Sequence, residues 1–354
     1  MNLAGDRLTR YSFVLIIIGI IVFSLVYFRN LIQPFVLAVI VWYLIRAIRE
    51  VIGKITYNQK SLPRWIRTTL AILITFALLW LVIEIISYNV TLIIEKSTAY
   101  NQNLRAFIRT IADFTGIENI DTFLREQVAK VDLQEWATSL LNTLSALLGN
   151  TALIFIYTIF LLIEENFMPS KIKSFLEASN NKETVYDIVK RITSSINTYF
   201  AVKVGVSLLT GVLSYIALAI IGVDFAVLWA FLIFVFNFIP YVGSLIATLL
   251  PAFFAIFQFA SFIPFLWVLI SVEAIQILVG SYIEPRIMGK SLNLSPLVVI
   301  LSLAFWGAIW GVVGMLLSVP IISVLTIVLA HFPSTKKIAI LFSEKGNVDS
   351  YIEN

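Results

Sequence analysis

The chain has 354 residues, of which 60% are hydrophobic and only 13% are charged, and its mean hydropathy is +0.95. A soluble domain carries roughly 25% charged residues to cover its surface, so a purely water-soluble globule is excluded and lipid must cover much of this chain. The net charge is +4, but the basic residues lie mostly in short loops, where they indicate membrane topology rather than nucleic-acid binding. The sequence contains no cysteine, which excludes disulfides, zinc–thiolate sites and cysteine nucleophiles.

The long apolar runs predict helices. Inside a bilayer every backbone polar group must be satisfied by the protein itself, which only helices and closed barrels achieve. The runs are far longer than the ~10 residues of a barrel strand and do not alternate. The sequence therefore predicts an all-α, polytopic transmembrane bundle. We expect about eight spans, a C-terminal broken-helix hairpin and an amphipathic helical insert outside the membrane.

Three spans are predicted in the N-terminal part, over about 11–28, 31–45 and 68–94. Arg7 and Arg10 precede the first span, and no small-residue cleavage site follows it, so we interpret it as uncleaved. The loop after the second span carries a single acid, Glu50, among basic residues: Arg46, Arg49, Lys54, Lys60, Arg64 and Arg67. This excess predicts that the loop and the N-terminus are cytoplasmic.

The middle of the chain alternates between polar and apolar segments. Residues 95–145 are polar, lean acidic and carry apolar residues at spacings of three and four, which predicts amphipathic helices outside the membrane. A fourth span is expected over about 146–163. The amphipathic segment 171–191 is consistent with a helix on the bilayer surface, a helix packed on a partner, or a plain connector.

The C-terminal part is almost free of charge from Tyr199 onward. A fifth span to about Ile221 and a sixth to about Phe238 are followed by a break at 237–244. Further apolar segments cover 245–259, with Pro251 inside, and 262–282. The stretch 297–329 exceeds the ~20 residues of one crossing and contains glycines near its middle, so a hairpin of two short helices is expected.

These segments define five expected regions. They are N-terminal transmembrane helices (1–94), the extramembrane insert (95–145), a span with a cytoplasmic amphipathic helix (146–197), the C-terminal transmembrane core (198–332) and a cytoplasmic tail (333–354). The loop charges place Arg286, Lys290 and the C-terminal lysines on the cytoplasmic side.

A few polar residues fall within the apolar segments. Glu273 and Gln276 are three apart, which would place them on nearly the same helical face, and a carboxylate at membrane depth faces a partner or a water path. For Glu273 an ion pathway and a salt bridge to a neighbouring helix both remain open. Lys203 is interpreted as a flank anchor of the fifth span, and Asp224 as a turn or helix-capping residue.

Two motif blocks in residues 195–330 resemble the autoinducer-2 exporter family of bacterial transporters. The first contains Trp229-Ala230, Asn237-Phe238-Ile239-Pro240 and Gly243-Ser244, with Pro251 and Gln258 downstream. The second contains Gly280-Ser281-Tyr282-Ile283-Glu284-Pro285-Arg286-Ile287-Met288-Gly289 and Leu292-Asn293-Leu294-Ser295-Pro296. It continues through Phe305-Trp306-Gly307, Gly311, Gly314-Met315-Leu316 and Val319-Pro320. Family members commonly have Asn where this chain has Ser281, which removes the paired donor and acceptor of an amide.

The resemblance implies a gradient-driven exporter of small hydrophilic molecules such as autoinducer-2, in the bacterial plasma membrane, as a homo-oligomer. Proline and glycine at membrane depth are typical of broken helices that expose backbone to a substrate, although tight packing and kinking explain them equally for Gly307, Gly311 and Gly314. The expected substrate or ion pathway comprises Asn237, Pro240, Gly243, Glu273, Gln276, Gly280, Ser281, Pro285, Arg286, Ser295 and Pro296.

Two alternatives stay open. Some relatives in the family are linked to exchange of sodium or lithium for protons, with Glu273 as the candidate titrating group. The chain would otherwise be a non-transporting oligomeric scaffold or channel, with the insert 95–145 mediating assembly. No phosphate-binding glycine loop, metal-ligand cluster or nucleophile–base pair is visible in the sequence, so we expect no enzyme activity, metal or cofactor.

Overall fold

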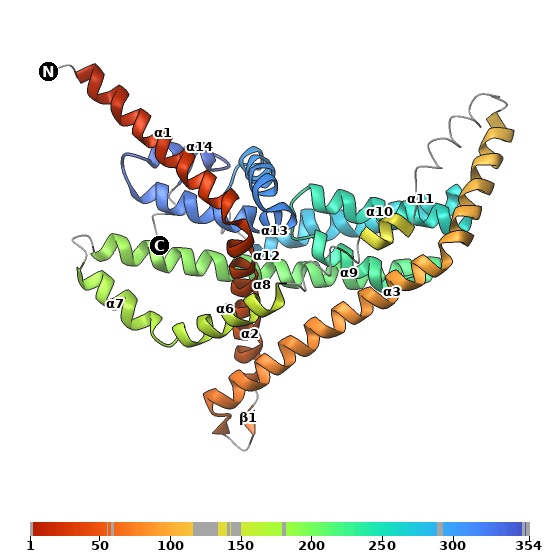
Figure 1. Cartoon of the computed structure of the whole chain (residues 1–354), viewed down its shortest axis with the longest axis horizontal. Coiled ribbons are helices and arrows are strands. Elements are labelled where there is room, and N and C mark those ends of the chain that lie inside the picture. The colour runs from red at the N-terminus through yellow and green to blue at the C-terminus, as the bar shows by residue number, and fades with distance from the viewer. Residues whose placement is uncertain are drawn as a thin grey trace. The chain divides into compact units, whose positions relative to one another are not determined.

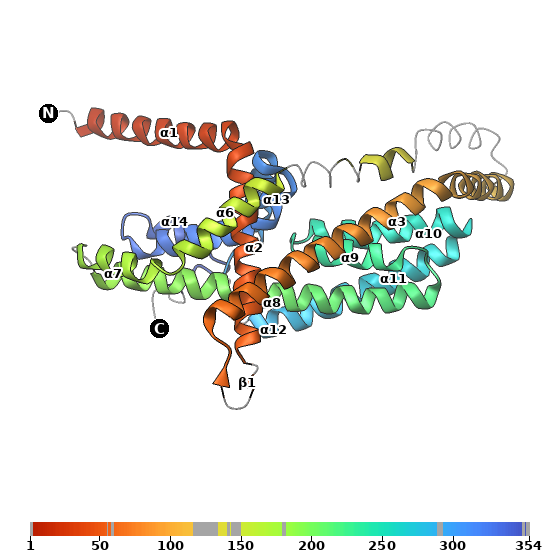
Figure 2. The same ribbon diagram turned by 60° about the horizontal axis from the view of Figure 1, so that its bottom comes forward.

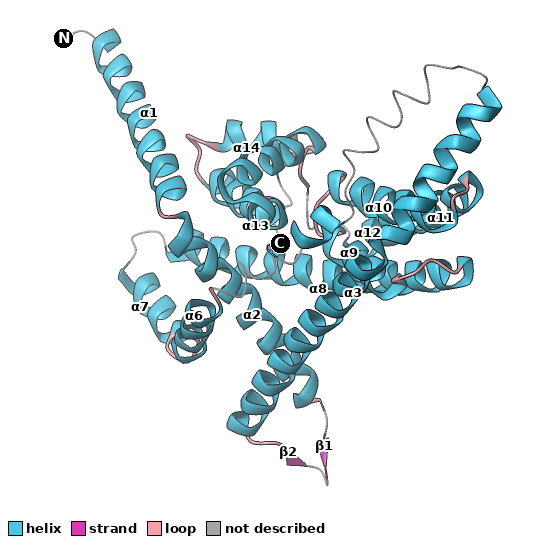
Figure 3. Ribbon diagram, turned by 45° about the vertical axis from the view of Figure 1, so that its right-hand side comes forward, coloured by secondary structure: helices cyan, strands magenta, loops and turns pink. Residues whose placement is uncertain are grey.

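The computed structural model describes residues 3–54, 56–57, 60–115, 134–139, 142, 150–178, 182–288, 293–348 and 351, and the described chain is almost entirely helical (Figures 1 and 3). The helices of the first half are α1 (Leu3–Tyr27), α2 (Arg29–Gly53), α3 (Arg64–Thr115), α6 (Thr151–Glu164) and α7 (Met168–Ala178). Those of the second half are α8 (Lys182–Ile221), α9 (Ala226–Phe236), α10 (Val242–Phe259), α11 (Phe262–Ile277), the π-helix η1 (Leu278–Ile283), α12 (Glu284–Met288), α13 (Pro296–His331) and α14 (Lys336–Phe342). Two short strands, β1 (Thr56–Tyr57) and β2 (Lys60–Ser61), form an antiparallel hairpin.

The all-α, multi-pass fold class is confirmed. Six of the described helices are long and apolar enough to cross a membrane, or seven if the bent pair α6–α7 is one span. The expected number of about eight is therefore not established. The apolar part of α1, Ser12–Tyr27, and the eleven-residue α9 are shorter than a full crossing.

Helix α3 is much longer than the span expected at 68–94. Its 52 residues extend about 78 Å at ~1.5 Å per residue, against a hydrocarbon core of about 30 Å. The helix therefore continues through the first part of the predicted polar insert. The rest of that insert lies outside the described residues except for 134–139 and 142.

The chain forms two compact units. Unit 1 contains Met1–Thr75, Gly149–Lys182 and Val299–Ile322, and unit 2 contains Phe76–Leu148, Glu183–Val298 and Ser323–Asn354. In unit 1 a small core of Ile45, Ile52 and Ala71 receives Leu162 of α6. Glu165, directly after α6, pairs with Arg49 of α2 and accepts a hydrogen bond from the indole of Trp42 at 3.2 Å.

The expected hairpin in the last apolar stretch is confirmed. Gly311 of α13 has φ +60° and ψ −140°, which interrupts the helix and which few residues other than glycine adopt. The hydroxyl of Ser302 donates to the carbonyl of Ser318 at 3.0 Å. These residues would lie about 24 Å apart in a straight helix, so the chain folds back on itself at Gly311.

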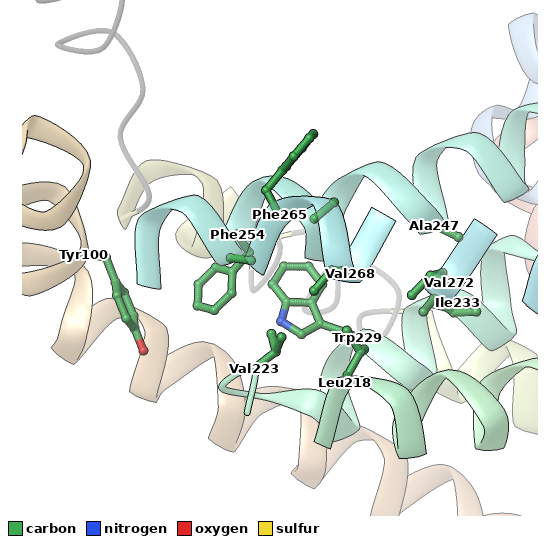
Figure 4. Close-up of a cluster of buried hydrophobic side chains, with 12 residues drawn as sticks. Tyr100, Leu218, Val223, Trp229, Ile233, Ala247, Phe254, Phe265, Val268 and Val272 are labelled. Carbon is green, nitrogen blue, oxygen red and sulfur yellow. The ribbon is translucent and has the colours of Figure 1, made fainter. Parts of the chain in front are cut away.

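The core of unit 2 is an aromatic and aliphatic cluster drawn from α3, α8, α9, α10 and α11. Figure 4 shows the indole of Trp229 packed among Phe254, Val268 and Val223, with Tyr100 approaching from α3. Helices α10 and α11 run side by side in this unit (Figure 2). This packing holds α9 and α10, on either side of the break, against α8 and α11.

Candidate functional site

The break between α9 and α10 is built by the sequence Asn237-Phe238-Ile239-Pro240-Tyr241. Asn237 is buried, and its side-chain amide donates to the hydroxyl of Ser207 on α8 at 3.0 Å. Tyr241 has φ +59°, outside the helical region. A Cβ on Gly243 would lie 1.8 Å from the carbonyl oxygen of Phe236, so only glycine allows the chain to restart α10 this close to the end of α9.

A row of polar side chains faces inward along α8. Tyr199, Lys203, Ser207, Thr210 and Ser214 are all buried. Their spacings of four, four, three and four place them on one face of the helix. Over 15 residues this row extends about 22 Å, most of the thickness of a bilayer core. A polar face of this length, turned toward protein in an otherwise apolar helix, is typical of a pathway rather than of a structural span.

Lys203 forms a buried ion pair with Glu284, the first residue of α12. The Nζ–Oε1 distance is 2.6 Å, and the two side chains are 7% and 18% exposed. Removing two charges from water is costly, so each group depends on the other for compensation. The Glu284 carboxylate also lies within electrostatic reach of the Tyr199 hydroxyl.

Several buried polar atoms near this row have no hydrogen-bond partner within the described residues. They are the Tyr199 hydroxyl, Ser214 Oγ, Thr248 Oγ1 and Gln276 Nε2. Buried polar groups of native proteins are nearly always satisfied by protein or by water. Unpartnered groups therefore indicate places where water or a polar ligand binds.

The packing of unit 2 places three of these groups, those of Ser214, Thr248 and Gln276, beside one hydrophobic cluster. Leu218 of α8, Ala247 of α10 and Val272 of α11 belong to one packed cluster. Ser214 and Gln276 lie one helical turn from Leu218 and Val272 respectively, and Thr248 follows Ala247. We call the whole set the polar seam; it comprises Tyr199, Lys203, Ser207, Thr210, Ser214, Asn237, Thr248, Gln276 and Glu284.

Part of the residue set predicted from the sequence lies in or beside the seam. Asn237 and Gln276 belong to it, and Gly243 and the half-buried Pro240 form the adjoining break. Other predicted residues are exposed: Glu273, Gly280, Ser281, Pro285 and Arg286. Ser295 and Pro296 lie outside the seam; the Ser295 N–H donates to the carbonyl of Phe342 at 2.8 Å, and Pro296 begins α13.

Glu273 and Gln276, expected on nearly the same helical face, differ in burial. Gln276 is 6% exposed, whereas Glu273 lies on the exposed side of α11. Three residues of an α-helix turn through about 300°. The remaining 60° is enough to carry Glu273 out of the narrow inward face.

Sequence reasoning missed the central charges of the seam. The interpretation of Lys203 as a flank anchor is wrong, because its side chain is buried and paired. Glu284 belongs to the second motif block but not to the predicted pathway residues. The spacing of Tyr199, Lys203 and Ser207 at intervals of four was the available signal.

Long apolar helices around a buried polar row define a multi-pass membrane protein with an interior suited to transport. The family described as AI-2E family transporter matches residues 11–334. The chain therefore belongs to the AI-2E transporter family.

Proteins similar to this chain are named as transport proteins. The chain is 35% identical over 207 residues to the AI-2 transport protein TqsA of Escherichia coli, an alignment covering 58% of this chain and 59% of TqsA. It is 31% identical over 308 residues to a Haemophilus influenzae protein, named only provisionally as a transport protein, covering 83% and 85% of the two chains. The E. coli protein YhhT, also provisionally named, is 27% identical over 288 residues, covering 80% and 81%.

Proposed function

We propose that this chain is a gradient-driven exporter of small hydrophilic molecules and that the polar seam of unit 2 forms its pathway. The observation that carries this proposal is the group of buried polar atoms on α8, α10 and α11 that have no hydrogen-bond partner among the described residues. A hydrophilic solute loses its hydration in a membrane and needs replacement hydrogen bonds. The break at Asn237 supplies further polar backbone beside the seam.

Autoinducer-2 is the first substrate to test, because the name of TqsA refers to AI-2 transport. The test uses everted vesicles, in which export appears as substrate uptake driven by an imposed ion gradient. Asn237→Leu and Gln276→Leu each replace a polar side chain of the seam by an apolar side chain of similar size. Thr193→Val is the matched control, since Thr193 lies on α8 but is exposed, and its hydroxyl donates to the carbonyl of Val189.

We expect the two seam variants to lower the uptake rate by about tenfold, because one lost buried hydrogen bond costs about 1–3 kcal/mol. The Thr193→Val rate should equal that of the unchanged chain at equal expression. Full uptake by Asn237→Leu and Gln276→Leu would remove the seam from the pathway. Absence of gradient-driven uptake in the unchanged chain would reject autoinducer-2 as its substrate.

Sodium–proton exchange is a second candidate function, favoured by the buried Lys203–Glu284 pair. Glu273 is a poorer carrier because it is exposed. Vesicles loaded with a pH-sensitive dye distinguish the functions. Exchange requires sodium-dependent proton flux without organic substrate, and Glu273→Gln should retain that flux.

The proposed setting is the bacterial plasma membrane, with the chain embedded in lipid as a homo-oligomer, both termini in the cytoplasm and no nucleic-acid partner. Because the sequence lacks cysteine, one cysteine added at either terminus reports its side. Labelling by an impermeant maleimide in everted vesicles but not in intact cells is expected; the reverse would invert the topology. Mass measurement in detergent tests the oligomer, and deletion of residues 95–145 tests whether that insert mediates assembly.

A further inference from the structure

The Lys203–Glu284 pair lies directly beside a rare backbone conformation. The π-helix η1 covers Leu278–Ile283, and Glu284 is the next residue. A π-helical turn accommodates one more residue than an α-helical turn, and such segments occur frequently at functional sites. The position of Glu284 on its helix therefore depends on whether η1 keeps this conformation.

A change of η1 from π to α geometry would move Glu284 around the helix. One residue corresponds to about 100° of rotation, enough to turn Glu284 away from Lys203. The ion pair opposes this change, since Lys203 would otherwise remain as a buried charge without compensation. Neutralising Glu284 leaves the Lys203 charge buried without compensation, and this cost favours the release of η1 and α12 from α8.

We infer that Glu284 is a proton-binding site of this chain and that its protonation releases η1, admitting water to the polar seam at the Lys203 end. The proton comes from water onto the Glu284 carboxylate. Lys203 then gains hydration in place of its lost partner. This inference rests on the proposed function in one respect: it makes the proton the coupling ion of the exporter.

The surroundings of Glu284 favour it over the other acidic residues as the proton-binding group. Two titratable groups of the described chain are placed against it, Lys203 and Tyr199, both from α8. Arg286 on α12 and Glu273 on α11 are exposed. Protonation of the exposed Glu273 would leave no buried charge unpaired, so it would not drive a rearrangement.

A single cysteine can report whether water reaches the seam. Ser214→Cys is a near-isosteric change at a buried hydroxyl that has no hydrogen-bond partner among the described residues, so it breaks no existing bond. The full chain in lipid vesicles is treated with a small water-soluble thiol reagent between about pH 8 and about pH 5. Thr193→Cys, on the exposed side of the same helix, corrects for the intrinsic pH dependence of thiol reactivity.

In the otherwise unchanged chain, the corrected labelling rate at Ser214→Cys should rise about tenfold or more as the pH falls. The rate should be high at every pH with Glu284→Gln, which imitates the protonated carboxyl. The Glu273→Gln background should keep the rise. A flat profile in the unchanged chain, or a rise that persists with Glu284→Gln, would overturn the inference.

A double variant guards against simple misfolding. Lys203→Met with Glu284→Gln removes both charges and leaves none unpaired, so labelling should be low at every pH. High labelling in both the single and the double variant would mean that the helices have come apart, and the inference would fail. Labelling uses no transported substrate, so a preserved labelling response without uptake would reject the export proposal and leave the proton site standing.

Discussion

Two lysine–carboxylate pairs among the described residues of unit 2 lie in different environments. Lys203 and Glu284 are 7% and 18% exposed, whereas Lys96 and Asp224 are 52% and 36% exposed, with a separation of 3.2 Å. Water and salt screen the second pair, so its contribution is small. The buried pair has no such screening and must remain matched. The two pairs have the same kinds of side chain and differ in burial. Breaking the buried pair should therefore affect the fold much more than breaking the exposed pair.

The exposed pair belongs to a hydrogen-bond network at the turn between α8 and α9. Asp224 accepts from the Tyr100 hydroxyl at 2.8 Å, and its backbone N–H donates to Gln258 Oε1 at 2.7 Å. The amide of Gln258 also donates to the carbonyl of Gly222 at 2.9 Å. The sequence interpretation of Asp224 as a turn residue is confirmed. The hydrogen-bond network connects α3, the turn and α10.

The largest effect is expected from unpairing the buried charges. Glu284→Gln should lower the free energy of unfolding by about 3–5 kcal/mol, because the Lys203 charge loses the carboxylate that compensates it in the folded chain. The double change of Lys203→Met with Glu284→Gln should recover most of that loss. Thermal unfolding of the purified chain in detergent measures both. Equal losses in the single and double variants would show that the pair is not coupled.

A smaller loss of stability is expected from Gln258→Leu, which changes the hydrogen-bond network at the turn. This change removes two hydrogen bonds to the backbone of the turn and should cost about 1–3 kcal/mol. Gln258→Glu keeps an acceptor for the Asp224 N–H and should cost less. The comparison of the two pairs would need revision if Gln258→Leu proved more damaging than Glu284→Gln in the same unfolding assay.

The smallest effect is expected from Lys96→Met. An exposed pair contributes about 0.2–1 kcal/mol, and added salt should shrink the difference from the unchanged chain. Lys203→Met serves as the contrast, with a larger loss that salt hardly changes. Unfolding midpoints at low and high salt measure both. A salt-independent loss at Lys96 would mean that its environment is drier than its exposure indicates.

Much of the fold could be predicted from local sequence, because its signals are strong along the chain. The breaks after Asn237 and within α13 were both expected from proline and glycine in apolar segments. The length of α3 was not expected, since amphipathic residues after Ile94 continue a helix as readily as they start a new one. The number of spans depended on the apolar part of α1 and on the short helix α9, for which length is a weak criterion.

The candidate site was only partly predictable. Asn237, Gln276 and Glu273 were predicted together as pathway residues; the first two are buried, whereas Glu273 is exposed. Lys203 was interpreted as a flank anchor but is buried. A membrane helix is apolar on its lipid side and on its protein side, so hydrophobic periodicity does not orient it. The facing residues of α8 and α12 decide which charges meet, and they are 81 residues apart in the chain.

The sequence by itself determined that this protein is a helical membrane protein of the AI-2E family, because low charge, long apolar runs and motif spacing are properties of the chain alone. Only the tertiary structure decided that Lys203 and Glu284 form a buried pair beside a π-helix and that Glu273 lies apart from them. Burial depends on which helix faces meet across distant segments, and no local pattern of residues encodes that meeting.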